Sequence, residues 1–589
     1  MYEILNRINW PEDVKKLNNE ELKVLAQDIR DALMNRLTKR WWHFWPNFGM
    51  VEAEIALHYV FNSPIDKFVY DVSHQSYPHK MLTWRKDAYI DEAHFEDVSG
   101  YTNPEESEHD FFNVGHTSTS ISLATWLAKW RDLKWDKENI IAVIWDWSLS
   151  WWEALEWLDF AGSELDSNII ILVNDNQQAI SETHGWLYKN LEELRKTNWK
   201  AENNLFKAMW LDYIYEEEWN NIEKLIEVFQ KVKDIDHPIV VHINTTKWKG
   251  YKIAEENKEP WHWCMPFDPE TGKSKFSFWD GENYLTLTSD FLLKKMKKDN
   301  KVVVVTPAMP TAIGFFQDKR KEAWKQFVDV WIAEEQAVAL ISWISKNWWK
   351  PILWTNATFI QRTYDQISQD LCINNNPATI LLNYTSVWWL NDVTHLWIFN
   401  YSIFSNIPNL ILLAPTSKQE YLNMVDRSIE QREHPVMILI PWNWVVNDWR
   451  EVDKLFDNIN TYKIEQKWEK VAILALWDFY QLGEKTAQEI ESKLWFKPTL
   501  INPRFASWID EKLLEELKAN HELVITLEDW ILEWGFGYKI ASYYGPTSMK
   551  VKNYGLNKEF YDRYDANELL NSLWITPEKI TEDVKSIIG

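Results

Sequence analysis

The chain has 589 residues, enough for about three or four domains, and its formal net charge of −25 argues against nucleic acid or an anionic membrane as its main partner. Its two cysteines, Cys264 and Cys372, indicate a reducing compartment and offer no metal-site spacing. The N-terminal stretch is charged and amphipathic without a signal-peptide pattern, and no run of about 18 apolar residues occurs. We therefore expect a cytoplasmic enzyme that acts on small molecules.

Tryptophan and glycine occur in unusual proportions. The chain has 40 Trp and only 15 Gly, although glycine normally makes up roughly 7% of residues. The tryptophans fall in turns, at helix ends and before proline, as at residues 347–351 and 441–444, where glycine supplies backbone freedom. We interpret most of them as glycines, from a gene that uses UGA for glycine but was translated with UGA as tryptophan. The alternative is a genuinely tryptophan-rich protein.

The N-terminal region alternates predicted helices and strands. A cap at Asn18 or Asn19 predicts a helix to about Arg36, with its apolar residues on one face. The elements that follow are a loop at 41–49, a helix at 51–61, a strand at 67–72 that delivers Ser73-His74-Gln75, and a small-residue turn at 115–120 that opens a helix.

Residues 140–176 predict a buried strand, a turn, an amphipathic helix and a second buried strand, which form a βαβ unit of a parallel sheet. Ligands of such sheets bind beyond the strand C-termini, where Asp146 and Asn176 fall. Their oxygens suit Mg²⁺ when a phosphate supplies other ligands, and Gln178 could add a backbone carbonyl. The alternative is a structural role for both residues in capping turns.

A turn that presses its backbone against a diphosphate needs glycine, which has no Cβ. Here Trp145 and Trp147 flank Asp146, and an indole would fill the space of a phosphate. With glycine restored, the motif reads Gly-Asp-Gly-Ser-Leu-Ser-Gly-Gly-Glu and is followed by Asn-Asp-Asn. With these glycines the segment resembles the motif of thiamine-diphosphate enzymes.

The rest of the chain continues the α/β alternation. A strand at 238–245 leads to Tyr251, and a polar connection at 253–283 reads as a linker. Further strands are expected at 302–306, 327–330, 351–355, 379–383, 410–414, 436–440, 471–476, 499–501 and 523–527. The pattern predicts an α/β protein of three domains, 1–283, 284–455 and 456–589, each a mainly parallel sheet flanked by helices.

Several side chains in the predicted loops are candidates for chemistry. We assign Glu334, where a strand gives way to a helix, to chemistry, whereas a capping role suits Glu335. Phe359 and Arg362 could provide an aromatic platform and a cation, although a core position is the alternative for the phenylalanine. Histidine is the usual proton carrier near neutral pH, and the loop histidines are His43, His74, His79, His116, His184, His262 and His395.

These residues together resemble the 1-deoxy-D-xylulose-5-phosphate synthases, of the transketolase-like thiamine-diphosphate enzymes. The similarity covers nearly the whole chain. It rests on the segments 71–80 (Asp-Val-Ser-His-Gln-Ser-Tyr-Pro-His-Lys), 114–120 (Val-Gly-His-Thr-Ser-Thr-Ser), 145–147 with glycine restored, 174–176, 332–334, 358–362, 394–395 and 533–537.

The resemblance implies a homodimer whose three domains bind the diphosphate, bind the aminopyrimidine, and form the C-terminal part. It implies that Asp146, Asn176 and Gln178 hold Mg²⁺. Glu334 would favour the imino form of the aminopyrimidine, and His43, His262 and His395 would handle protons and substrate. The cofactor contacts would be His74, Gly115, His116, Thr117, Trp147 (as glycine), Ser148, Asn176, Tyr251, Glu334, Phe359 and Arg362.

The implied reaction decarboxylates pyruvate and joins the two-carbon unit to D-glyceraldehyde 3-phosphate, which serves isoprene and thiamine biosynthesis. The family typically binds the acceptor phosphate with a Tyr and two Arg, where this chain has Asn356, Tyr384 and Trp442. The family's Asp before the Thr-His pair is Asn391. Losing two bidentate cations weakens phosphate recognition. The alternatives are an enzyme with another aldehyde acceptor and, if the tryptophans are genuine, a non-catalytic scaffold.

Overall fold

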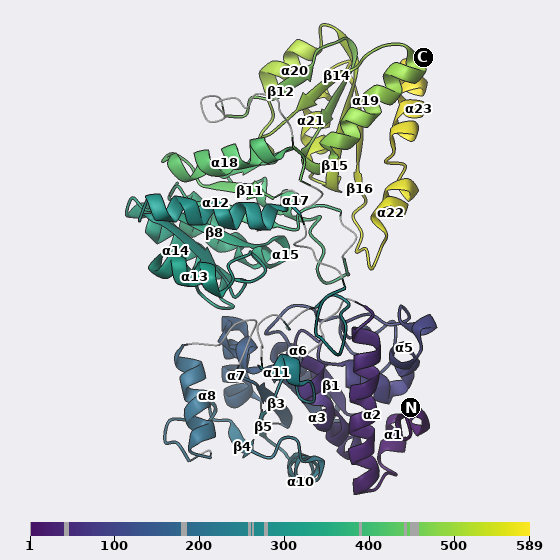
Figure 1. The fold of residues 1–589 in the computed structure, drawn as a ribbon, viewed down its shortest axis with the longest axis vertical. Helices are drawn as coiled ribbons and strands as arrows, with labels where there is room; N and C mark the ends of the chain where they lie inside the picture. The colour runs from purple at the N-terminus through teal and green to yellow at the C-terminus, as the bar shows by residue number, and fades with distance from the viewer. Residues whose placement is uncertain are drawn as a thin grey trace. The chain divides into compact units, whose positions relative to one another are not determined.

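The computed structural model describes residues 2–40, 46–165, 167–177, 185–198, 200–256, 261, 264–275, 281–387, 391–440, 445–447 and 459–589. The chain forms two compact units, Met1–Phe278 and Trp279–Gly589, which are coloured purple to teal and teal to yellow in Figure 1. No helix in these ranges is both long and apolar enough to cross a membrane.

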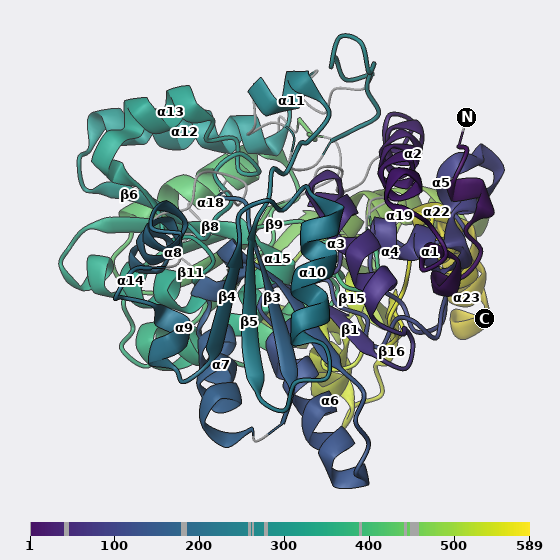
Figure 2. The ribbon, with the colours of Figure 1, turned by 90° about the horizontal axis from the view of Figure 1, so that it is seen from below.

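The first unit is built on a parallel sheet of five strands in the order β1-β2-β3-β5-β4. Every residue of β2 and β3 is buried, as expected for apolar strands covered on both faces. The strands are β1 (Lys67–Tyr70), β2 (Ile140–Trp145), β3 (Ile169–Asp175), β4 (Asp212–Glu216) and β5 (Pro238–Asn244). Figure 2 shows β3, β5 and β4 side by side with a helix next to them.

Helices cover both faces of this sheet. On one face, residues 120–134, 152–164 and 186–196 form an apolar cluster with alternate residues of β2 and β3. On the other, Phe61 packs against Phe68 of β1 and against Phe229. The helices are α1 (Pro11–Val14), α2 (Asn19–Leu37), α3 (Pro46–Val60), α4 (Tyr77–Lys80), α5 (Asp87–Ile90), α6 (Ser120–Lys134), α7 (Trp152–Glu164), α8 (Trp186–Lys196), α9 (Leu205–Ala208), α10 (Ile222–Val232) and α11 (Lys252–Glu256).

The second unit contains two sheets that share one apolar core. The six-stranded sheet is parallel, in the order β10-β11-β9-β8-β6-β7. The five-stranded sheet has the order β12-β14-β13-β15-β16, and in it β12 runs antiparallel to β14. The strands are β6 (Val302–Thr306), β7 (Phe327–Asp329), β8 (Lys350–Asn356), β9 (Thr379–Asn383), β10 (Ile411–Leu413), β11 (Val436–Leu439), β12 (Lys463–Gln466), β13 (Lys470–Ala475), β14 (Thr499–Asn502), β15 (His521–Ile531) and β16 (Lys550–Leu556).

Helices flank both sheets of the second unit (Figure 1). They are α12 (Tyr284–Lys298), α13 (Gln317–Ala323), α14 (Glu334–Lys346), α15 (Ala357–Ile360), α16 (Tyr364–Gln366), α17 (Asn400–Phe404), α18 (Lys418–Glu430), α19 (Tyr480–Leu494), α20 (Glu511–Leu517), α21 (Phe536–Tyr544), α22 (Ala566–Ser572) and α23 (Pro577–Ile588). The α/β class with mainly parallel sheets is therefore confirmed. The boundaries at 283/284 and 455/456 stay a proposal.

The predicted strands all occur, with ends that shift by a few residues. The predicted first helix is α2, and Asn18 caps it by accepting from the backbone N–H groups of Glu20 and Glu21. Three strands, β4, β12 and β16, were not predicted from the sequence. Each carries charged or half-exposed residues, because each lies at the edge of a sheet and only part of it packs against the core.

Candidate functional site

Two predicted metal ligands meet at the carboxyl edge of the first sheet. Asp146 follows β2 and Asn176 follows β3, and these strands are neighbours in the sheet. The backbone nitrogen of Asn176 lies 3.5 Å from Oδ1 of Asp146, and both residues are buried. Within the described part of the chain, Oδ2 of Asp146 has no hydrogen-bond partner. A buried carboxylate oxygen without a donor is a free ligand position.

Lys247, which the sequence analysis did not single out, supplies a buried cation near this carboxyl group. Burial raises the pKa of Asp146 to about 8, and the charge of Asp175 adds to this effect. Burial lowers the pKa of Lys247 to about 7, while the charge of Asp146 acts in the opposite direction. The position of Lys247, shortly after β5, was the available signal, since β5 lies beside β3 in the sheet.

Two indoles lie around Asp146. Trp145 and Trp147 are 1% and 6% exposed, and their rings stack with centroids 6.0 Å apart. The imidazole of His74 meets both rings edge-on, at 5.9 and 6.2 Å. The amine of Lys247 lies 5.8 Å from the ring of Trp145. The rings of both residues that flank Asp146 are therefore buried against each other and against His74.

The turn with Gly115, His116 and Thr117 is tied to the same sheet edge. Asp71, which follows β1, accepts from the backbone N–H groups of Ser118 and Thr119 at 2.5 and 3.1 Å. The hydroxyl of Ser118 donates to the carbonyl oxygen of Ser148 at 2.6 Å. These bonds bring the segment 115–118 to the turn that holds Asp146. Asp71 belongs to the segment 71–80 that carries the family resemblance, but its hydrogen bonds to the 118–119 backbone became apparent only in the structure.

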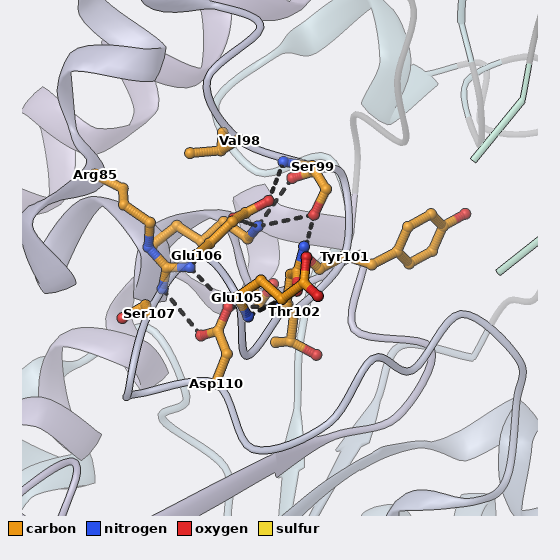
Figure 3. Close-up of polar contacts among 12 residues, drawn as sticks. Arg85, Val98, Ser99, Tyr101, Thr102, Glu105, Glu106, Ser107 and Asp110 are labelled. Carbon is orange, nitrogen blue, oxygen red and sulfur yellow. Dashed lines mark hydrogen bonds and ion pairs between the residues drawn. The ribbon is translucent and has the colours of Figure 1, made fainter. Parts of the chain in front are cut away.

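A buried polar network anchors the segment that leads to this turn (Figure 3). Asp110 accepts from two nitrogens of Arg85 at 2.7 and 2.9 Å, from Nε2 of His79 at 3.0 Å and from the backbone N–H of Asn103 at 2.8 Å. Lys80 donates to Glu106 at 2.6 Å. Burial opposes the ionisation of Asp110, but the charge of Arg85 and the bond from His79 hold its pKa below its ordinary value. The network holds the segment 103–110.

Tyr251, a predicted cofactor contact, is buried in the first unit. Its hydroxyl donates to the carbonyl oxygen of Pro269 at 3.0 Å, and its ring packs against Trp261 and Phe267. The predicted residues His43, Gln178 and His262 lie outside the described residues, as does Trp442.

In the second unit, Glu334 is the first residue of α14 and is 4% exposed. Burial raises its pKa to about 7, although the charge of Arg362 acts against this shift. Among the described residues, Oε2 of Glu334 has no hydrogen-bond partner. A helix N-terminus favours negative charge, so Glu334 can hold or release a proton near neutral pH.

The neighbouring candidates of this unit follow adjacent strands. The ring of Phe359 meets that of His395 edge-on at 6.0 Å, and Thr394 Oγ1 lies 2.8 Å from Nδ1 of this histidine. Tyr384 is stacked on Trp397 with centroids 4.9 Å apart, and burial raises its pKa. Asn356 ends β8 and is buried. Neither Asn356 nor Tyr384 supplies a cation.

Three family descriptions match the chain in sequence. Residues 5–203 match "1-deoxy-D-xylulose-5-phosphate synthase", 283–444 match "Transketolase, pyrimidine binding domain", and 461–580 match "Transketolase, C-terminal domain". The 1-deoxy-D-xylulose-5-phosphate synthase of Alkaliphilus oremlandii is 33% identical over 99% of this chain and 99% of its own length. The chain belongs to the 1-deoxy-D-xylulose-5-phosphate synthase family.

Other members of the family match equally widely. The synthase of Clostridium beijerinckii is 32% identical over 99% of both chains, and a synthase of Geobacter sulfurreducens is 31% identical over 100% of this chain and 98% of its own length. Among solved structures, the transketolase of Campylobacter jejuni matches with a TM-score of 0.44 at 14% identity over 97% of this chain and 100% of that one.

The 1-deoxy-D-xylulose-5-phosphate synthase family depends on thiamine diphosphate and Mg²⁺. The polar residues at the edge of the first sheet suit such a group, because Asp146 and Asn176 offer oxygen ligands and Lys247 offers a cation. The two indoles do not. With Trp145 and Trp147 buried against His74, the chain as written does not fit a diphosphate beside Asp146.

Proposed function

We propose that the protein is a synthase that removes CO₂ from pyruvate and joins the remaining two-carbon unit to D-glyceraldehyde 3-phosphate, giving 1-deoxy-D-xylulose 5-phosphate. The observation that carries this proposal is the match to the synthase of Alkaliphilus oremlandii at 33% identity over 99% of both chains. The three sheets, mainly parallel and flanked by helices, are in keeping with it.

The proposed metal ligands are Asp146, Asn176 and Gln178. The first two support this assignment because they follow adjacent parallel strands and are buried. The activity also requires residues smaller than indoles at 145 and 147, since both rings lie against His74. The further cofactor contacts proposed are His74, Gly115, His116, Thr117, residue 147 as glycine, Ser148, Tyr251, Glu334, Phe359 and Arg362.

Glu334 is the proposed proton-holding residue of the second unit. Its burial and its pKa of about 7 allow it to carry a proton at neutral pH without a strong partner. His395 is a proposed proton handler, with Thr394 beside its Nδ1 atom. His43 and His262 are assigned the same role by family resemblance.

The direct test is a steady-state assay with pyruvate and D-glyceraldehyde 3-phosphate. It uses a gene recoded with glycine at the tryptophan positions and supplies thiamine diphosphate and Mg²⁺. We expect 1-deoxy-D-xylulose 5-phosphate and CO₂ in equal amounts, and a Glu334→Gln variant at least about 100-fold slower. A fully folded recoded protein that releases no CO₂ would exclude the proposed activity.

A second candidate is a related enzyme with another aldehyde acceptor. The buried Asn356 and the half-buried Tyr384 stand where the family typically has phosphate-binding side chains, and neither brings a positive charge. The ratio of kcat/KM for D-glyceraldehyde 3-phosphate to that for D-glyceraldehyde separates the two. A ratio below one would favour the second candidate, because a site built for the phosphate prefers the charged aldehyde.

A non-catalytic scaffold is the third candidate, and the indoles beside Asp146 are the observation that favours it. Calorimetric titration of the natural protein with thiamine diphosphate and Mg²⁺ decides between scaffold and enzyme, since a scaffold gives no heat of binding. We also propose a cytoplasmic homodimer, which light scattering at increasing protein concentration would test.

A further inference from the structure

Ten tryptophans adopt a left-handed backbone conformation. In the part of the chain that the structure describes, 24 residues other than glycine have a positive φ, and ten of them are tryptophan while four are asparagine. A Cβ meets the following carbonyl oxygen in this region, so glycine, and less often Asn or Asp, enters it routinely. The ten are Trp84, Trp135, Trp210, Trp324, Trp331, Trp348, Trp477, Trp495, Trp534 and Trp574.

Four of these tryptophans end a helix with the same pair of hydrogen bonds. After α6, the N–H of Trp135 donates to the carbonyl of Asp132 at 3.1 Å, and the next N–H, of Asp136, donates to Arg131 at 3.2 Å. This pair defines the Schellman motif, whose left-handed position normally holds glycine. The same two bonds close the helical segments before Trp210, Trp348 and Trp574.

The chain contains an internal control for this motif. After residues 367–372, the N–H of Asn375 donates to Cys372 at 3.0 Å and that of Asn376 to Leu371 at 3.1 Å. Asn375 has a φ of 47°, and asparagine is the accepted substitute for glycine at this position. The motif is therefore built with its usual chemistry where tryptophan is absent.

Burial does not offset the cost of the left-handed backbone at the exposed positions. The side chains of Trp135 and Trp495 are 90% and 89% exposed, and both are helix C-caps with φ values of 64° and 62°. Trp324 has φ 49° and ψ −124°, which lies outside the regions open to residues with a side chain. An indole in water gains no burial that would balance such a backbone.

Other tryptophans have a backbone conformation that does not favour glycine. Trp126 and Trp130 lie inside α6, and Trp343 lies inside α14, where any L-residue adopts the helical backbone. The backbone conformation thus distinguishes two groups of tryptophan positions. At the left-handed positions the backbone favours glycine, whereas inside the helices it does not. A chain genuinely rich in tryptophan would show no such preference for the left-handed region.

We infer that the natural protein carries glycine at the ten left-handed tryptophan positions and at 145 and 147. The last two positions rest on the proposed function, because there the argument is the space filled beside Asp146 and not the backbone. A single reassigned codon explains both groups of positions. The structure thereby turns a compositional anomaly into a prediction for twelve named residues.

Peptide mass mapping of the protein purified from its source cells tests this inference without any recombinant folding step. We expect glycine in the fragments that contain positions 135, 210, 348, 495 and 574. An intact indole at these positions would overturn the inference. Glycine there with tryptophan at 145 and 147 would overturn the cofactor site and leave the backbone argument standing.

A matched pair of substitutions in one helix tests the backbone argument by itself. In the recombinant chain as written, we expect Trp135→Gly to raise the urea midpoint, because the left-handed position is relieved. Trp126→Gly, nine residues upstream in the interior of α6 and also exposed, should lower the midpoint, because glycine weakens a helix interior. A fall for both variants would contradict the assignment.

Discussion

Two buried aspartates of the first unit differ in how they are paired. Asp110 receives two bonds from Arg85, one from His79 and one from a backbone N–H, and its pKa is lowered. Asp146 has one backbone nitrogen at 3.5 Å, and its pKa is raised to about 8 by burial. The chain itself therefore satisfies the carboxylate of Asp110, whereas Oδ2 of Asp146 has no hydrogen-bond partner among the described residues, as expected of the metal ligand proposed for it.

We expect the largest effect on stability from removing the cation that pairs with Asp110. Arg85→Met leaves Asp110 buried without its cation, and we expect a loss of roughly 3–5 kcal/mol in the stability of the first unit. Hydrogen exchange of the β2 and β3 amides, followed by mass spectrometry, measures this free energy. Arg40→Ala removes an exposed pair with Glu96 and serves as the control, with an expected loss of less than about 1 kcal/mol.

The pH dependence of stability extends the comparison to a third buried carboxyl group, that of Glu54. Burial raises the pKa of Glu54 from its ordinary 4.5 to about 8, although the hydroxyl of Tyr70 donates to it at 2.8 Å. The folded state therefore holds the proton more tightly, and stability falls as the pH rises from about 4.5 to about 8.

Glu54→Gln should remove up to about 4 kcal/mol of this pH dependence, because glutamine stays neutral. Thermal unfolding at half-unit pH steps checks the slope, with the exposed Glu105→Gln as the control. An unchanged slope in Glu54→Gln would show that this carboxyl group is ionised in the folded protein, contrary to its burial.

We expect the smallest effect on stability from a substitution of Asp146, whose carboxyl group has few partners among the residues that the structure describes. Asp146→Asn should change stability by less than about 1 kcal/mol near pH 7 without added metal, because the amide resembles the protonated carboxyl that burial favours. In a background with glycine at 145 and 147, the same substitution should abolish the rise in Tm caused by Mg²⁺ with thiamine diphosphate. A large loss without metal would place Asp146 in the same class as Asp110.

The fold was largely predictable because its strands are continuous apolar runs, and β2 and β3 are fully buried. The proximity of Asp146 and Asn176 was predictable because parallel strands bring their carboxyl ends to one edge, while their role as metal ligands stays a prediction. Lys247 and Asp71 were not found, since their roles depend on contacts with residues far away in the sequence. The edge strand β12 was missed because Lys463–Gln466 alternates charge with only partial burial.

The strand β12 also has a consequence for solubility. It is four residues long, shifts its register against β14 between Ile464 and Gln466, and carries an ion pair between Lys463 and Glu465. Short, irregular and charged border strands are poor templates for the backbone of a second molecule. At high protein concentration, this edge of the third sheet should therefore resist edge-to-edge aggregation, although the unpaired backbone groups of an open sheet edge favour it.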